Sequence, residues 1–290
     1  MADYDDHALT AAVLASFAAT PEPRTRELVT GLVKHLHAYV RDVNLSFDEW
    51  RFAIDFLTRT GHMSGPLRQE LILLSDVLGV SMLVDAIEHR ARGAATDTTV
   101  LGPFYVGEHR PTPSGADLAR GLRGDPMHVE ATLRDEHGAP LAGATIDVWH
   151  ADADGLYDSQ RPGYTLTTPS LRGRFTSDAA GRFWFRTIVP CSYAIPTDGP
   201  VGELLAATRR HPMRPAHVHF FLRAPGRAPL VTHVFVAGDG YLASDAVFGV
   251  KPSLVVTLAP HAEPQYPDGV PAPTPWQQMT YAFVMTPRAT

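Results

Sequence analysis

The run Arg214-Pro215-Ala216-His217-Val218-His219-Phe220 indicates how the second half of the chain folds. Its alternation of side chains is typical of a β-strand. Successive side chains of a strand point to opposite faces, so His217 and His219 share one face while Val218 points to the other. Two imidazoles on one face, joined by phenols from elsewhere in the chain, suggest a metal site.

Tyr157 and Tyr193 are the phenols that could complete this site. Phenolate is a hard, anionic oxygen donor. Together with imidazole nitrogen it favours iron(III) over zinc, which prefers cysteine, histidine and carboxylate ligands. Taken alone, each of these four residues is interpreted at least as well as an ordinary half-buried strand residue as it is as a metal ligand. The prediction therefore depends on their combination.

Other short strands surround this run after Gly93, where glycine and proline become frequent. Many short strands with turn signals and no intervening helices favour an antiparallel β-sandwich or barrel. Long excursions at 152–174, 191–214 and 239–253 carry the candidate residues, and loops of this length are usually functional. The predicted strands are Met127–Leu133, Thr145–Trp149, Arg182–Ile188, His217–Leu222, Leu230–Val236, Leu254–Leu258 and Thr280–Met285.

The first third of the chain is predicted to be helical. Apolar residues from Leu28 to Val43 recur with a period near 3.6, and Ser46 with Glu49 forms a capping box that starts another helix. Two further helices are expected near 67–78 and 81–92, with Gly79 between them. We therefore expect an α+β protein, with a helical domain at residues 1–98 and an antiparallel β-sandwich domain at residues 99–290.

Composition limits the class of protein. The chain has 290 residues, of which 44% are hydrophobic and 19% charged, so it can bury a core and is not disordered. A net charge of −6 without a dense cluster of Lys and Arg argues against nucleic acid as a partner. The single cysteine, Cys191, fits a reducing compartment. The acidic N-terminus lacks a signal peptide, and no apolar run reaches the length of a membrane span, so a cytoplasmic protein is expected.

Three segments resemble the intradiol ring-cleaving dioxygenases, the non-haem iron(III) enzymes that open catechols between the two hydroxyls. They are Leu141-Ala142-Gly143-Ala144-Thr145-Ile146-Asp147-Val148-Trp149-His150 leading to Gly155-Leu156-Tyr157, then Tyr193-Ala194-Ile195-Pro196-Thr197-Asp198-Gly199-Pro200-Val201-Gly202, then Arg214-Pro215-Ala216-His217-Val218-His219. The resemblance covers nearly the whole chain and implies a helical N-terminal part followed by a catalytic β-sandwich.

The resemblance implies a role for each matching residue. Tyr157, Tyr193, His217 and His219 would be ligands of Fe(3+), and Tyr193 would leave the metal when substrate binds and accept a proton. Arg214 would stabilise charge on the reacting ring, in place of the alternative, a surface salt bridge. His233 stands where many relatives have glutamine. We interpret it as a catalytic residue hydrogen-bonded near the substrate and not as a third imidazole ligand.

Two further segments, 232–239 and 244–251, resemble the branch of this family that uses O2 to cleave hydroxyquinol, benzene-1,2,4-triol, to 3-hydroxy-cis,cis-muconate, the enol form of maleylacetate. Asp76 is the most informative pocket position, because a carboxylate in an apolar pocket needs a partner such as a third hydroxyl. Alternatively, Asp76 is a solvated residue on a helix face with no role in substrate binding. The implied substrate-binding positions are Leu73, Asp76, Val100, Leu101, Gly102, Pro103, Phe104, Ile195, Pro196 and Val247.

Other functions remain open from the sequence. The substrate could be catechol or chlorocatechol, and Leu101, where some relatives have an aromatic residue, could widen the pocket. The chain could also be a silent, transthyretin-like β-sandwich that binds ligands. A cupin-type Fe(II) oxygenase also has His-x-His on a strand, but this sequence has paired tyrosines where a carboxylate ligand is needed. The family further implies a homodimer through the N-terminal helices, which can hold a phospholipid.

Overall fold

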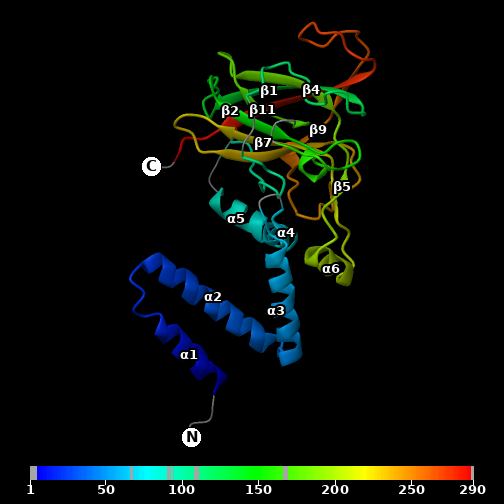
Figure 1. The fold of residues 1–290 in the computed structure, drawn as a ribbon. Helices are drawn as coiled ribbons and strands as arrows, with labels where there is room; N and C mark the ends of the chain where they lie inside the picture. Colours follow the sequence, from blue (N-terminus) through cyan, green and yellow to red (C-terminus); the bar gives the residue numbers. More distant parts are fainter. Residues whose placement is uncertain are drawn as a thin grey trace. The chain divides into compact units, whose positions relative to one another are not determined.

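Helices come first along the chain and strands follow, as the computed structural model shows in Figure 1. The structure describes residues 5–65, 68–89, 93, 95–107, 111–165 and 169–288. The fold class is as predicted, with helices before β-sheets. The N-terminal helices are α1 (Asp6–Ser16), α2 (Pro23–Asp42), α3 (Phe47–His62), α4 (Glu70–Val77) and α5 (Val80–Glu88).

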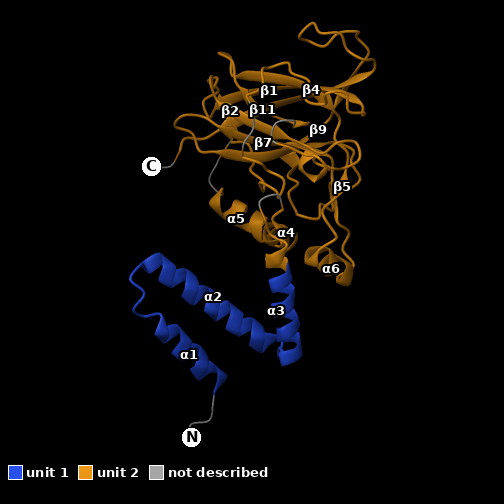
Figure 2. Ribbon diagram, viewed as in Figure 1, with its two compact units in different colours: residues 1–59 blue, residues 60–290 orange. Residues whose placement is uncertain are grey.

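The chain divides by its internal contacts into two compact units, residues 1–59 and residues 60–290 (Figure 2). The division falls near the end of α3, so α4 and α5 belong to the same unit as all the strands. The domain boundary between residues 98 and 99 was predicted where helices give way to strands, and it stays a prediction. Among the described residues, no helix is both long and apolar enough to cross a membrane.

Local signals in the sequence explain where several helices begin. The Ser46 backbone N–H donates to the Glu49 carboxylate at 2.8 Å and the Glu49 N–H donates to the Ser46 hydroxyl at 3.3 Å, which confirms the predicted capping box. Gly79 has a φ of 72° between α4 and α5, a left-handed conformation that glycine adopts without strain. The expected break between these two helices is therefore confirmed.

The strands in the described part of the chain form two main sheets and one small one. One sheet has the order β10-β11-β1-β4, the second has the order β3-β2-β7-β8-β9, and β5 pairs with β6. The bounds are β1 Pro126–Asp135, β2 Thr145–Trp149, β3 Arg172–Thr176, β4 Arg182–Ile188, β5 Tyr193–Ala194, β6 Met213–Arg214, β7 His217–Arg223, β8 Leu230–Val236, β9 Val255–Val256, β10 Ala259–His261 and β11 Trp276–Met285.

The prediction of a purely antiparallel sandwich is wrong in two places. β1 pairs with β11 in parallel, and β8 pairs with β9 in parallel. Both pairs join strands that are separated by a long stretch of chain, so no tight hairpin forces them to run in opposite directions. The structure also adds β3 and a helix, α6 (Pro200–Ala207), inside excursions that were predicted as loops.

The core lies between the two main sheets, where alternate side chains of each strand meet. On β7 the inward residues are Val218, Phe220 and Leu222, all fully buried. Their neighbours His217 and His219 therefore point to the opposite face of the sheet, as the alternation in the sequence predicts. This outer face of the five-stranded sheet carries the candidate site.

Candidate metal centre

The register of three adjacent strands places a row of rings on the outer face of the sheet. Trp149 on β2 is opposite His219 on β7, and His219 is opposite His233 on β8. The Trp149 and His219 rings stack with centroids 4.6 Å apart and an angle of 14° between planes. This stacking fixes the plane of the His219 ring, so its Nε2 has a defined direction.

The two tyrosines reach this face from outside the sheet. Tyr157 follows the turn after β2, where its backbone N–H donates to the Gln160 side-chain oxygen at 2.9 Å. Tyr193 lies on the short strand β5, directly opposite Arg214 on β6. Both phenols are buried. The excursions that were predicted to carry the site residues therefore do so, and a small sheet holds one of them in position.

The polar atoms of the four predicted ligands converge. The Tyr157 oxygen lies 2.8 Å from His219 Nε2 and 3.0 Å from the Tyr193 oxygen. His217 Nε2 lies 3.1 Å from His219 Nε2. With bonds of about 2 Å to a common metal, neighbouring ligands are expected to lie about 3 Å apart. The spacing of these four side chains therefore fits a single metal ion.

Both histidines are neutral, and His217 is also held in the tautomer that binds metals. His217 Nδ1 is 2.7 Å from the Pro215 carbonyl, which can only accept, so Nδ1 carries the proton and Nε2 keeps a free lone pair. Burial, and secondly the charge of Arg214, lowers the pKa of His217 to about 3. Burial also holds the pKa of His219 far below its ordinary value. Both imidazoles are neutral near pH 7, as metal ligation requires.

The phenols need a cation to become strong donors. Burial raises the pKa of Tyr157 well above its ordinary value, and burial also raises the pKa of Tyr193. A cation between the two oxygens would reverse this effect, because it favours the charged phenolates that burial disfavours. Two phenols beside two neutral imidazoles thus make a donor set that suits a hard, highly charged cation.

His233 lies beside this group but is engaged differently. Together with His217 and His219 it forms a cluster whose ligand atoms lie within 4.8 Å of one another. However, Arg214 Nη2, which can only donate, lies 3.3 Å from His233 Nδ1. The His233 ring also stacks on His217, with centroids 4.8 Å apart. This position beside Arg214 agrees with the interpretation of His233 as a neighbour of the substrate, which stays a prediction.

Arg214 connects several of these residues while fully buried. Its Nε and Nη2 donate to Asp245 at 3.0 Å and 3.3 Å, and its Nη1 lies 3.2 Å from His217 Nε2. The alternative of a surface salt bridge does not hold, because the Arg214 side chain is only 2% exposed. The sequence did not identify Asp245 as its partner, and no local pattern at Asp245 could have done so.

A cavity of about 400 Å³ lies between α4, α5 and the segment 99–102. Of the predicted substrate-binding residues, Asp76, Val100, Leu101 and Gly102 line it. Gly102 has a φ of 79°, and a Cβ built there would lie 3.2 Å from His219 Cε1, so this wall of the cavity touches the ring of a predicted ligand. The alternative of a solvated Asp76 does not hold, because Asp76 is 1% exposed.

The other predicted substrate-binding residues do not line this cavity. Phe104 stacks on Tyr157 with centroids 4.6 Å apart. Pro103 and Pro196 are half-buried. The remaining members of the set are fully buried, namely Leu73, Ile195 and Val247. Sequence reasoning missed the buried ion pair between Arg172 and Asp158, the residue that follows Tyr157. Arg172 also donates to the Phe104 carbonyl at 3.3 Å.

Comparisons with known proteins agree with this geometry. Residues 100–287 match the family described as "Dioxygenase", and residues 22–96 match "Catechol dioxygenase N terminus". The chain is 52% identical to the 6-chlorohydroxyquinol 1,2-dioxygenase of Cupriavidus pinatubonensis, over 88% of this chain and 92% of that protein. It is 46% identical to the hydroxyquinol 1,2-dioxygenase of Nocardioides simplex, over 95% of this chain and 93% of that protein.

Solved structures give the same picture. The crystal structure of hydroxyquinol 1,2-dioxygenase from Pseudomonas putida DLL-E4 superposes with a TM-score of 0.87 at 44% identity, covering 98% of this chain and 99% of that one. The catechol 1,2-dioxygenase of Pseudomonas arvilla C-1 superposes with a TM-score of 0.84 at 29% identity, covering 100% of this chain and 94% of that one.

Proposed function

Since this chain belongs to the intradiol ring-cleaving dioxygenases, we propose that it cleaves hydroxyquinol with O2 to 3-hydroxy-cis,cis-muconate, the enol form of maleylacetate, in the degradation of aromatic compounds. The observation that carries this proposal is the convergence of the Tyr157, Tyr193, His217 and His219 donor atoms at 2.8–3.1 Å. The identity of 52% to a 6-chlorohydroxyquinol 1,2-dioxygenase supports the substrate class.

We propose iron(III) as the metal that these four side chains hold. Two phenolates and two neutral imidazoles supply hard anionic and borderline donors, which favour the oxidised cation. Bound iron(III) would act as a Lewis acid that makes the substrate hydroxyls more acidic and activates the ring towards O2. Each of the four residues is at most 6% exposed, so the donor atoms that would hold the metal lie below the protein surface.

Two residues of the chain would handle protons and charge. Tyr193 would accept a substrate proton at its phenolate oxygen, since a tyrosine that leaves a cation regains its high pKa. Arg214 would donate from Nη1 to a substrate oxygen, because Nε and Nη2 are both bound to Asp245. His233 Nδ1 would accept a hydrogen bond from Arg214 Nη2, the nitrogen that also donates to Asp245.

Asp76 is the residue that would select the third hydroxyl. Its Oδ1 is buried and has no hydrogen-bond partner among the described residues. Burial raises the pKa of Asp76 to about 6. A substrate hydroxyl in the cavity would supply the missing hydrogen bond, and a ring without that hydroxyl would leave Oδ1 without a partner, which costs free energy.

One experiment tests the metal and the substrate together. Purified, iron-loaded protein is titrated with hydroxyquinol and with catechol without oxygen, and oxygen is then admitted and the product identified. We expect a visible absorption band from tyrosinate bound to iron(III), a change of that band with substrate, and a ring-opened dicarboxylate. A protein that binds no iron would instead favour the silent β-sandwich. A nearly colourless Fe(II) centre would favour a cupin-type oxygenase, and equal turnover of catechol would favour the catechol or chlorocatechol reaction.

We also propose that the chain forms a homodimer through its N-terminal helices. The apolar stripe of α2 stays exposed, including Leu28, Leu32 and Leu36. Apolar stripes of this kind usually contact a partner. The same apolar surface could hold the tail of a phospholipid. A cytoplasmic location also stays a proposal, supported by the single cysteine.

A further inference from the structure

Asp245 is the partner that fixes the direction of the buried Arg214 guanidinium. Both side chains are 2% exposed, and two nitrogens of the arginine reach the two carboxylate oxygens, at 3.0 Å and 3.3 Å. A side-on pair of this kind holds the plane of the guanidinium as well as its charge. Only Nη1 stays outside the pair, and its neighbour is the His217 Nε2 lone pair at 3.2 Å. A metal bound to His217 would take that lone pair and leave Nη1 to donate elsewhere.

The carboxylate is in turn held by the backbone of its own turn. Its Oδ1 accepts from the Val247 N–H at 3.3 Å, and its Oδ2 accepts from the Gly249 N–H at 3.0 Å. The Ala246 N–H donates to the Met213 carbonyl at 3.1 Å, which ties the same turn to the strand of Arg214. A Cβ at Gly249 would lie 3.2 Å from Arg214 Nη2, so the turn and the guanidinium are packed closely.

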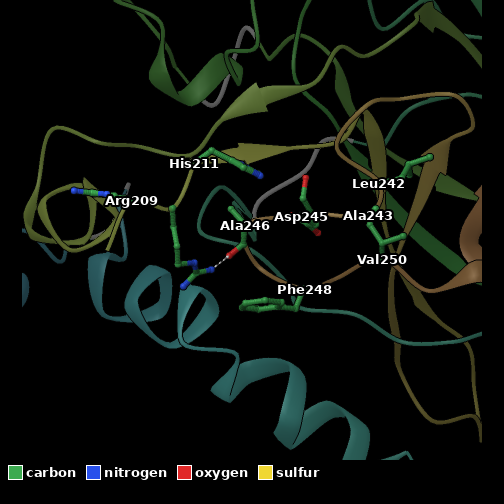
Figure 3. A pocket seen from close by; sticks show the side chains of 10 residues that line it. Arg209, His211, Leu242, Ala243, Asp245, Ala246, Phe248 and Val250 are labelled. Carbon is green, nitrogen blue, oxygen red and sulfur yellow. Dashed lines mark hydrogen bonds between the residues drawn. The ribbon is translucent and has the colours of Figure 1, made fainter. Parts of the chain in front are cut away.

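The other side of Asp245 borders a second cavity, of about 550 Å³ (Figure 3). Of the described residues that line it, Arg209, Arg210 and His211 are basic and Asp245 alone is acidic; Phe248 also contributes. Arg210 donates to the Ala246 carbonyl at 3.0 Å, so it also supports the turn. A small anion could therefore approach the position of the Asp245 carboxylate from this side.

From these contacts we infer that Asp245 is a positioning residue for the proposed ring cleavage. It acts through Arg214, holding Nη1 towards the metal centre, and it sets the turn that carries Val247. This inference rests on the proposed function, because it concerns the step that Arg214 would assist. It predicts that Asp245 affects kcat more than KM, since Arg214 would act on charge that develops during the reaction.

The test is chemical rescue of Asp245→Ala in the full chain. We expect kcat to fall on the order of 100-fold, the usual effect of a misplaced catalytic group, with KM changing much less. Formate can enter through the basic cavity and replace the missing carboxylate, so it should restore kcat at least about tenfold relative to chloride at equal ionic strength. The matched control is Asp239→Ala, because Asp239 accepts from the neighbouring Ala216 N–H at 2.9 Å, whereas the described hydrogen bonds of Arg214 go to other residues. Formate should not change this control.

A second measurement uses metal-free protein. Formate should raise the thermal midpoint of Asp245→Ala but not that of the wild type, because it binds only the folded state with the open position. This measurement distinguishes a failure of the proposed function from a failure of the inferred pairing between Asp245 and Arg214. A wild type that cleaves neither hydroxyquinol nor catechol overturns the proposed function, whereas the thermal measurement decides the pairing on its own. A kcat within about threefold of wild type, or no response to formate in either measurement, overturns the inference.

A third variant covers the case in which Asp245→Ala fails to fold. Asp245→Asn keeps the size of the side chain and one accepting oxygen, whereas its NH2 group can only donate and so loses the two hydrogen bonds that the other oxygen accepts. If Asp245 acts through Arg214, the double variant Arg214→Gln/Asp245→Asn should have the same kcat as Arg214→Gln alone. A further loss in the double variant would mean that Asp245 acts independently of Arg214, and the inference would be wrong.

Discussion

Gly155 lies directly against Tyr193, so that a Cβ built on Gly155 would be 2.7 Å from the tyrosine Cβ. This glycine belongs to the turn that leads to Tyr157, so one position without a side chain lets the two phenols approach to 3.0 Å. Its φ of 80° adds a second reason for glycine at this position. The spacing of the two tyrosines therefore depends on a residue that binds nothing itself.

We predict that Gly155→Ala displaces Tyr193 and weakens the metal centre. The tyrosinate absorption band of iron-loaded protein should shift or disappear, and kcat should fall on the order of 100-fold. The control is Gly163→Ala in the same excursion, which has the same φ of 80° but nothing within 4 Å of its Cβ. Backbone strain alone should affect both variants equally, so equal losses in the two would contradict the proposed contact.

Asp76→Leu should change the choice of substrate. The variant removes the proposed acceptor for the third hydroxyl, so the ratio of kcat/KM for hydroxyquinol to that for catechol should fall at least about tenfold. Steady-state kinetics with both substrates measure this ratio. Asp85→Asn is the control, because Asp85 lines the same cavity but is bound to Lys251 at 2.8 Å. An unchanged ratio in Asp76→Leu would show that Asp76 does not recognise the third hydroxyl of hydroxyquinol.

Asp76→Asn should change how stability depends on pH. Burial raises the pKa of Asp76 from 3.8 to about 6. Between these values the folded protein binds more protons at Asp76 than the unfolded chain, so this carboxyl lowers the stability as pH rises through the window. A difference of about 2 in pKa corresponds to roughly 3 kcal/mol once pH exceeds 6. The unfolding free energy of the variant, relative to wild type, should therefore increase from pH 4 to pH 6 and then stay level.

Asp85→Asn should show the opposite trend in the same denaturant titrations. Although burial alone would raise it, the bond to Lys251 holds the pKa of Asp85 below its ordinary value. A depressed carboxyl pKa stabilises the folded state above the unfolded pKa, and this contribution is lost as pH falls through the folded pKa. The same sign of pH dependence in both variants would contradict the assignment of one buried and one paired carboxylate.

Leu32→Glu in α2 should dissociate the proposed homodimer. The side chain is exposed, and a charge in an apolar interface is costly to bury. Sedimentation at micromolar concentration should show a monomer for this variant and a dimer for the wild type. Lys34→Glu, on the same helix outside the apolar stripe, should remain a dimer. A monomeric wild type would remove the basis of this prediction.

Much of the candidate site was predictable because its signals are local. The alternation of His217, Val218 and His219 is a property of one strand, and the structure puts both imidazoles on the outer face as expected. The capping box at Ser46 and the break at Gly79 depend on neighbouring residues and were also correct. The α+β class followed from the change after Gly93, where the helical periodicity ends and glycine, proline and short alternating segments become frequent.

The relationships that were missed join residues far apart in the sequence. Arg214 and Asp245 are separated by 31 positions, and nothing near either residue specifies the other. The parallel pairing of β1 with β11 is not encoded in either strand alone, because alternation does not report direction. α6 was predicted as loop because its eight residues are too few to show a clear helical period.

The pairing of β1 with β11 also limits when the protein can fold during synthesis. β1 lies between β11 and β4, so the sheet that backs the core stays incomplete until Met285 has left the ribosome. Until then β1 presents an open edge that other chains can pair with. Nascent chains arrested before β11 should therefore depend on chaperones to avoid aggregation.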